Sequence, residues 1–188
     1  NPTSAGAVDV NGDATSSLSA NAAAGNINYN ALGNDVDVEI GSINGANTGS
    51  SAEADFDVLN GNLTVGPYSA TGDLDLNQQA PFGATNSNIA LQDTINVGGD
   101  LNATTGTAQQ LTIQNNGGNP ANITIAGAAT LNTPTIDYVG DNGSLSAAGD
   151  INIQSNSPGG ALTVDSTGAN NTRLASTGGN LNFNLLCQ

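Results

Sequence analysis

The chain has 188 residues, one basic residue against sixteen acidic ones, and a formal net charge of −15 at pH 7. Nucleic-acid binding depends on Lys and Arg that displace phosphate counterions, so composition predicts that no nucleic acid is bound. No apolar run approaches the roughly 18 residues of a membrane-spanning helix, and we expect no such span. Because the chain begins at Asn1, we expect any export signal to lie outside it.

Helix formers are scarce. There is no Met and no Lys, whereas there are 25 Gly, and Gly, Asn and Thr are unfavourable inside helices. We expect at most one short helical turn, over residues 15–24. Elsewhere apolar and polar residues alternate with a period of two, which is typical of strands with one buried face. The predicted strands span residues 27–29, 36–40, 56–58, 63–65, 74–76, 95–97, 111–113, 123–125, 136–138, 151–153, 162–164 and 181–185.

A short motif precedes many of these strands, namely Gly, then Asp or Asn, then an aliphatic residue. Gly and Asn tolerate the left-handed backbone region, and an Asp side chain can bond the amide two residues further on. The motif therefore predicts a tight local turn that feeds each strand. It occurs at residues 25–27, 61–63, 72–74, 99–101, 149–151 and 179–181.

Short strands that recur about every ten residues between Gly/Asn turns are found in β-sandwiches and in β-solenoids. The uniform shortness of the strands favours a parallel β-solenoid, with about 20 residues per coil and on the order of nine coils around an axial core. The alternative is a β-sandwich or jelly roll like a pilin subunit. We expect a single β-rich domain over residues 1–188; the alternative divides it into an acidic half, 1–94, and a repeat-like half, 95–188.

Three segments of the second half carry a family resemblance: Gly-Gly-Asp-Leu at 98–101, Ala-Gly-Asp-Ile-Asn-Ile at 148–153 and Gly-Gly-Asn-Leu-Asn-Phe at 178–183. They resemble the repeats of filamentous haemagglutinin-like and autotransporter-like bacterial surface adhesins. The resemblance implies a right-handed parallel β-helix that is extracellular, sits at a bacterial cell surface and serves in adhesion or matrix building. This chain differs from those adhesins in being far shorter and in lacking Lys.

Residues for catalysis are missing. A Ser or Cys nucleophile requires a nearby base, usually His, and the chain has no His and no Lys. With Cys187 as its only cysteine, the chain has no intramolecular disulfide. We expect that thiol to be inert; the alternative is an intermolecular bridge. Carboxylate pairs such as Asp73 and Asp75 could in principle cleave sugars, but the chain has only three Tyr, three Phe and no Trp to hold a sugar ring. We predict no enzymatic activity and no catalytic residue.

Alternating acidic residues could bind a cation. Calcium takes oxygen ligands from carboxylates and carbonyls, and acids two apart lie on one face of a strand. We expect calcium to be the only cofactor the chain could take; the other interpretation of these acids is a solvated strand face. The candidate ligands are Asp35, Asp37, Glu39, Asp55, Asp57, Asp73 and Asp75.

The last predicted strand is followed by more apolar residues, and the open end of a coil exposes core side chains. We expect Leu181, Phe183, Leu185 and Leu186 to contact another subunit. The first functional hypothesis is an extracellular, non-catalytic structural or adhesive surface protein whose partner is a host or matrix surface. The alternative is a self-assembling subunit of an extracellular filament, joined to other copies of itself by strand addition.

Overall fold

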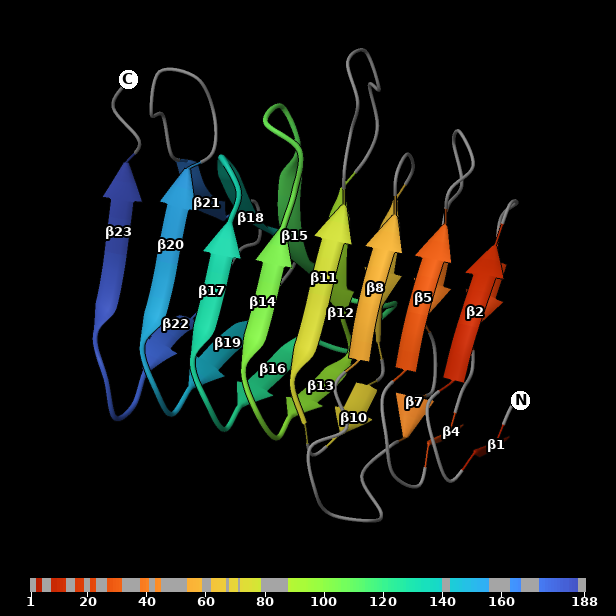
Figure 1. The fold of residues 1–188 in the computed structure, drawn as a ribbon. Helices are drawn as coiled ribbons and strands as arrows, with labels where there is room; N and C mark the ends of the chain where they lie inside the picture. The colour runs from red at the N-terminus through yellow and green to blue at the C-terminus, as the bar shows by residue number, and fades with distance from the viewer. Residues whose placement is uncertain are drawn as a thin grey trace.

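The computed structural model describes the following parts of the chain: residues 3–4, 8–12, 16–18, 21–22, 27–31, 38–40, 43–44, 54–58, 62–66, 68–70, 72–78, 88–139, 143–155, 163–166 and 173–185. The strands in these parts form three long sheets and one two-stranded sheet (Figure 1). Their strands are short and parallel, as the period-two alternation predicts.

The eight-stranded sheet consists of β2 (Val8–Gly12), β5 (Ile27–Ala31), β8 (Ala54–Val58), β11 (Leu74–Gln78), β14 (Leu101–Thr104), β17 (Ala129–Asn132), β20 (Ile151–Ser155) and β23 (Leu181–Leu185). The seven-stranded sheet consists of β3 (Ser16–Leu18), β6 (Val38–Ile40), β9 (Leu63–Val65), β12 (Ile89–Gln92), β15 (Gln110–Gln114), β18 (Thr135–Val139) and β21 (Thr163–Ser166). The six-stranded sheet consists of β7 (Ile43–Asn44), β10 (Tyr68–Ala70), β13 (Thr94–Val97), β16 (Asn122–Ile125), β19 (Ser144–Ala147) and β22 (Arg173–Ser176). β1 (Thr3–Ser4) pairs with β4 (Asn21–Ala22).

The chain visits the three sheets in turn, so each strand pairs with the strand three places further along. In Figure 1 it climbs through the near sheet and returns on the far side while successive coils advance from right to left, which is a right-handed coil. Every pairing between these strands is parallel, whereas a β-sandwich or jelly roll is built from antiparallel pairs. The predicted right-handed parallel β-solenoid is confirmed, and its sandwich alternative is wrong.

Successive coils differ in length. Register partners in neighbouring coils are 18 residues apart at the shortest, between Thr3 and Asn21, and 30 at the longest, between Ile151 and Leu181. The sequence predicted about 20, which fits some of the coils and is shorter than others. The extra residues lie in the corners, since the strands keep their register. The sheets also run on across residues 94 and 95, where the sequence suggested a subdivision.

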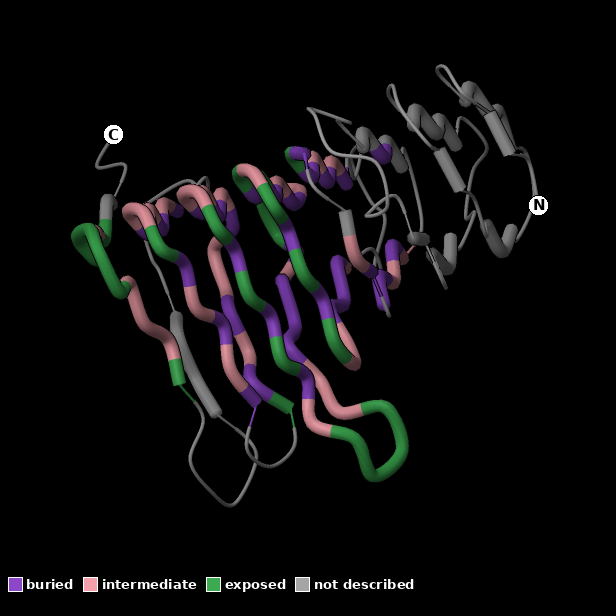
Figure 2. The backbone as a smooth tube through the Cα atoms, turned by 90° about the horizontal axis from the view of Figure 1, so that it is seen from below, coloured by how far each residue is buried: buried purple, intermediate pink, exposed green. Residues whose placement is uncertain are grey.

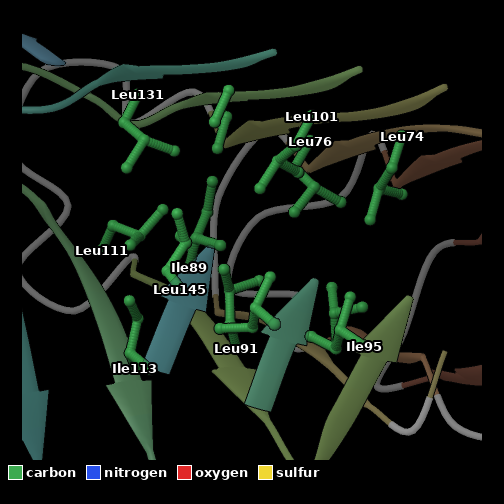
Figure 3. Close-up of a cluster of buried hydrophobic side chains, with 14 of the residues drawn as sticks. Leu74, Leu76, Ile89, Leu91, Ile95, Leu101, Leu111, Ile113, Leu131 and Leu145 are labelled. Atoms are coloured by element: carbon green, nitrogen blue, oxygen red, sulfur yellow. The ribbon is translucent and has the colours of Figure 1, made fainter. Parts of the chain in front are cut away.

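Apolar side chains from all three sheets meet along the axis of the coil (Figure 3). Along each strand, buried and more exposed residues alternate, as in the pattern of β11 and β20. Leu74, Leu101, Ala129 and Ile151 occupy the same row of four consecutive coils and are completely buried. Figure 2 shows this core as purple segments along the strands, which alternate with pink and green segments of more exposed residues.

The short helical turn predicted for residues 15–24 is wrong. Ser16–Leu18 forms β3 and pairs with Val38–Ile40, and Asn21–Ala22 forms β4. Backbone hydrogen bonds to a neighbouring coil form here instead of the local hydrogen bonds of a helix. Such tertiary contacts override helix propensity and cannot be read from a local sequence pattern.

The corner glycines are required for close packing between coils rather than for left-handed backbone. Gly99, Gly127 and Gly149 follow one another at one corner, and the amide of each later glycine donates to the carbonyl of the glycine one coil earlier, at 2.9 and 2.8 Å. A Cβ added at Gly127 would lie 2.7 Å from the carbonyl oxygen of Gly99 and would also collide with Asp100 Oδ1. Only Gly66 and Gly117 have positive φ among the described glycines.

This packing predicts that Gly127→Ala destabilises the coil by about 1–3 kcal/mol, the usual range for overpacking at a tight site. The matched control is Gly118→Ala, since a Cβ at Gly118 meets no atom within 4 Å. We expect the control to stay within about 0.5 kcal/mol of the parent chain. Urea unfolding followed by circular dichroism measures both, and equal stabilities would contradict the close-packing role.

Candidate functional surfaces

Carboxylates at one corner join successive coils. Asp73 Oδ1 accepts a hydrogen bond from the Asp100 amide, and Asp100 Oδ1 accepts one from the Ala128 amide, both at 2.7 Å. Asp150 Oδ1 does the same for the Asn180 amide at 2.7 Å. The sequence placed these bonds inside each turn, two residues apart; the structure places them between coils, 27 to 30 residues apart. We call this series the corner ladder.

Two rows of polar residues run along the eight-stranded sheet. The first polar row comprises Asp9, Asn28, Asp55, Asp75, Asn102, Thr130, Asn152 and Asn182. The second polar row comprises Asn11, Asn30, Asp57, Asn77, Thr104, Asn132, Gln154 and Asn184. Every position in both rows is Asn, Asp, Thr or Gln. Stacking in register brings these equivalent positions of successive coils side by side.

The polar rows carry no charge from Asn102 to Asn184. Within the first row, Asn102 Nδ2 donates to Asp75 Oδ1 at 2.7 Å and Asn182 Nδ2 donates to Asn152 Oδ1 at 2.9 Å. Neighbouring strands are about 4.8 Å apart, and residues two apart on a strand are about 6.6 Å apart. Amide and hydroxyl groups both donate and accept hydrogen bonds, so the face is a regular neutral grid of such groups.

The predicted calcium ligands are only partly brought together. Asp55 and Asp75 are register partners on neighbouring strands, and Asp57 pairs with Asn77. Glu39 lies in β6 of the seven-stranded sheet, opposite Thr64, and so belongs to a different sheet. Asp73 belongs to the corner ladder.

Asp35 and Asp37 fall outside the described residues. Within the described ranges, no three His, Cys, Asp or Glu residues gather in a way that could hold a metal ion. Calcium binding therefore remains a prediction from the sequence.

The C-terminal end of the coil exposes side chains from core positions. Leu181 is 41% exposed and Phe183 is 52% exposed, whereas their register partners Ile151 and Ile153 are completely buried. The backbone of Leu185 lies in β23, and Leu186 lies outside the described residues. β23 forms the edge of the eight-stranded sheet (Figures 1 and 2). Two of the four predicted contact residues are thus shown to be exposed apolar groups.

Buried polar groups do not define a separate site. The buried side-chain atoms that lack a hydrogen-bond partner in the described part of the chain come from three different sheets; they are Tyr68 Oη, Gln78 Nε2, Asn132 Oδ1 and Asp137 Oδ1. Burial raises the pKa of the Tyr68 and Tyr138 hydroxyls well above the usual range, and the charges of Asp73 and Asp75 add to this at Tyr68. Both phenols therefore stay protonated at neutral pH.

No family model, no curated protein and no solved structure matches the chain. Nothing in its described part forms a helix long and apolar enough to cross a membrane. The arrangement as a parallel β-solenoid is compatible with β-helix repeat proteins, and it comes from the stacking of the strands themselves.

Ala128 interrupts the corner ladder, because it stands between Asp100 and Asp150 and has no side-chain acceptor. We expect Ala128→Asn to stabilise the coil by about 1 kcal/mol, since the new amide oxygen can accept the Asp150 N–H as Asp150 accepts that of Asn180. The opposite change, Asp100→Ala, removes the acceptor of the Ala128 N–H and should lower the free energy of unfolding by about 1 kcal/mol. Thermal unfolding of both variants tests the ladder; a destabilised Ala128→Asn variant would count against it.

Proposed function

We propose that the chain is an extracellular, non-catalytic structural and adhesive protein of a bacterial cell surface. The observation that carries this proposal is the neutral grid formed by the two polar rows from Asn102 onward. The resemblance of residues 98–101, 148–153 and 178–183 to surface adhesin repeats supports the location and the adhesive role.

A grid of this kind suits a large, repetitive partner. A single neutral hydrogen bond contributes only about 0.5–1.5 kcal/mol net, so the polar residues of one strand bind a partner weakly. Several strands that contact the same polymer raise the overall affinity without any strong individual contact. The net charge of −15 disfavours an acidic polymer. We therefore propose a neutral, hydroxyl-rich polysaccharide of a host or matrix surface as the partner.

The absence of enzymatic activity is part of the proposal. The sequence contains no His and no Lys, so the usual bases for nucleophilic catalysis are lacking. The described carboxylates at Asp73, Asp100 and Asp150 accept backbone hydrogen bonds between coils. Their positions support a role in holding the coil together.

The test is binding of the purified chain to an array of neutral and acidic polysaccharides. We expect retention on neutral ones, and we expect the double variant Thr130→Ala/Gln154→Ala to bind about tenfold more weakly, as two lost hydrogen bonds predict. The matched control, Asn96→Ala/Thr124→Ala, removes two exposed polar side chains from the six-stranded sheet instead. Equal losses in both variants, or no retention of the parent chain on any neutral polysaccharide, would refute the proposal.

A further inference from the structure

Both ends of the coil present an edge of the eight-stranded sheet and an edge of the seven-stranded sheet. At the C-terminal end, the edges of the eight-, seven- and six-stranded sheets are β23, β21 and β22. At the N-terminal end, the edges of the eight- and seven-stranded sheets are β2 and β3. β2 and β23 lie at opposite ends of the eight-stranded sheet, so their free edges face in opposite directions along the axis (Figure 1). Because all pairings in the sheet are parallel, the chain runs in the same direction in both strands. An edge strand offers unpaired N–H and C=O groups to another strand.

The apolar rows of the eight-stranded sheet continue in register from one end to the other. Leu181 stands in the same row as Val8, which pairs with Ile27. Phe183 stands in the same row as Val10. A coil stacked on β23 would therefore place Val8 and Val10 opposite Leu181 and Phe183. It would remove from water the two apolar side chains of this edge that are 41% and 52% exposed.

The polar rows continue in register as well. The same alignment puts Asp9 opposite Asn182 and Asn11 opposite Asn184. An Asn and an Asp side by side in the first polar row already form a hydrogen bond within the coil, between Asn102 and Asp75. Stacking therefore requires no like charges opposite one another on the eight-stranded sheet.

Charge also distinguishes the two ends. Arg173, the only basic residue of the chain, is exposed on β22 at the C-terminal edge. Twelve of the sixteen acidic residues lie in residues 1–100, and Asp9 lies on β2 itself. The C-terminal edge thus carries the one positive side chain, on its six-stranded sheet, whereas the N-terminal edge carries Asp9 on its eight-stranded sheet.

We infer that the C-terminal edge of the coil binds the N-terminal edge of a second copy of this chain, with β2 of one copy added in register to β23 of the other. The contact is head to tail, and each copy keeps one free edge of each kind. Repeated contacts therefore build a linear filament rather than a closed dimer. This inference is independent of the proposed adhesion, since it involves the ends of the coil and not its outer face.

The test uses the purified full chain in sedimentation velocity and negative-stain electron microscopy over a range of protein concentrations. We expect sedimentation that increases with concentration, and rods longer than one coil. Phe183→Asp should raise the concentration needed for assembly at least tenfold, because it puts a charge in the new core row. The matched control is Val139→Asp, which changes an apolar residue that is 40% exposed but lies along the coil rather than at its end; its assembly should match that of the parent chain.

A mixing experiment separates loss of contact from loss of folding. Phe183→Asp blocks the C-terminal edge, and Val10→Asp blocks the N-terminal edge. At protein concentrations at which the parent chain just assembles, each variant alone should stay monomeric. An equimolar mixture should form a dimer and stop there, because one intact edge of each kind remains. A monomeric parent chain at all concentrations would overturn the inference, as would filaments that persist in both variants or a mixture that forms no dimer.

Discussion

The structure depends on the in-register stacking of parallel strands, each of which satisfies its backbone hydrogen bonds with the coil before it and the coil after it. Because register is fixed, every position of a coil becomes a row along the axis. The rows at inward positions form the core, from Leu74 through Leu101 and Ala129 to Ile151. The outward rows form a polar face. A substitution at one position is therefore felt by the equivalent positions of both neighbouring coils.

The corners follow the same rule. The glycines Gly99, Gly127 and Gly149 let successive corners approach to hydrogen-bonding distance. The side chains of Asp73, Asp100 and Asp150 each accept a hydrogen bond from a backbone amide of the next coil. One of the candidate calcium ligands, Asp73, thus serves the stacking at this corner. The surfaces on which we propose binding are the ones that stacking creates, namely the long polar rows and the two open edges.

Much of this fold is predictable from the sequence, because strands with Leu, Ile or Val at both inward positions show a clear period of two. Strands such as β14, β17 and β19 are harder to see, since Ala103, Ala129 and Ala147 occupy inward positions. Leu101 precedes Ala103 and Leu131 follows Ala129, so a large residue in one row accompanies a small residue in the other and the local volume is kept. The variable coil length, from 18 to 30 residues, also hides the repeat, because corners tolerate insertions at little entropic cost.

The candidate surfaces are less predictable, because they depend on which coil lies next to which. Period two places Glu39 and Asp55 on outward positions of their strands but does not say that they belong to different sheets. The acceptor role of Asp73 has its partner 27 residues away, beyond any local motif. The exposed apolar end was predictable, since Leu181 and Phe183 alternate like core residues and β23 is the edge strand of its sheet in the described part of the chain.

The central claim, regular stacking of one coil per strand spacing, is tested most directly by pulsed electron paramagnetic resonance distances along the first polar row. Spin labels on Cys substitutions in a Cys187→Ser background would pair Asn182 with Asp55 and, separately, with Asp75. These pairs are five and four strands apart in the eight-stranded sheet. Stacking at about 4.8 Å per strand predicts separations of roughly 24 and 19 Å, with a difference of one strand spacing. Distances that do not fall by about that step would contradict the parallel coil.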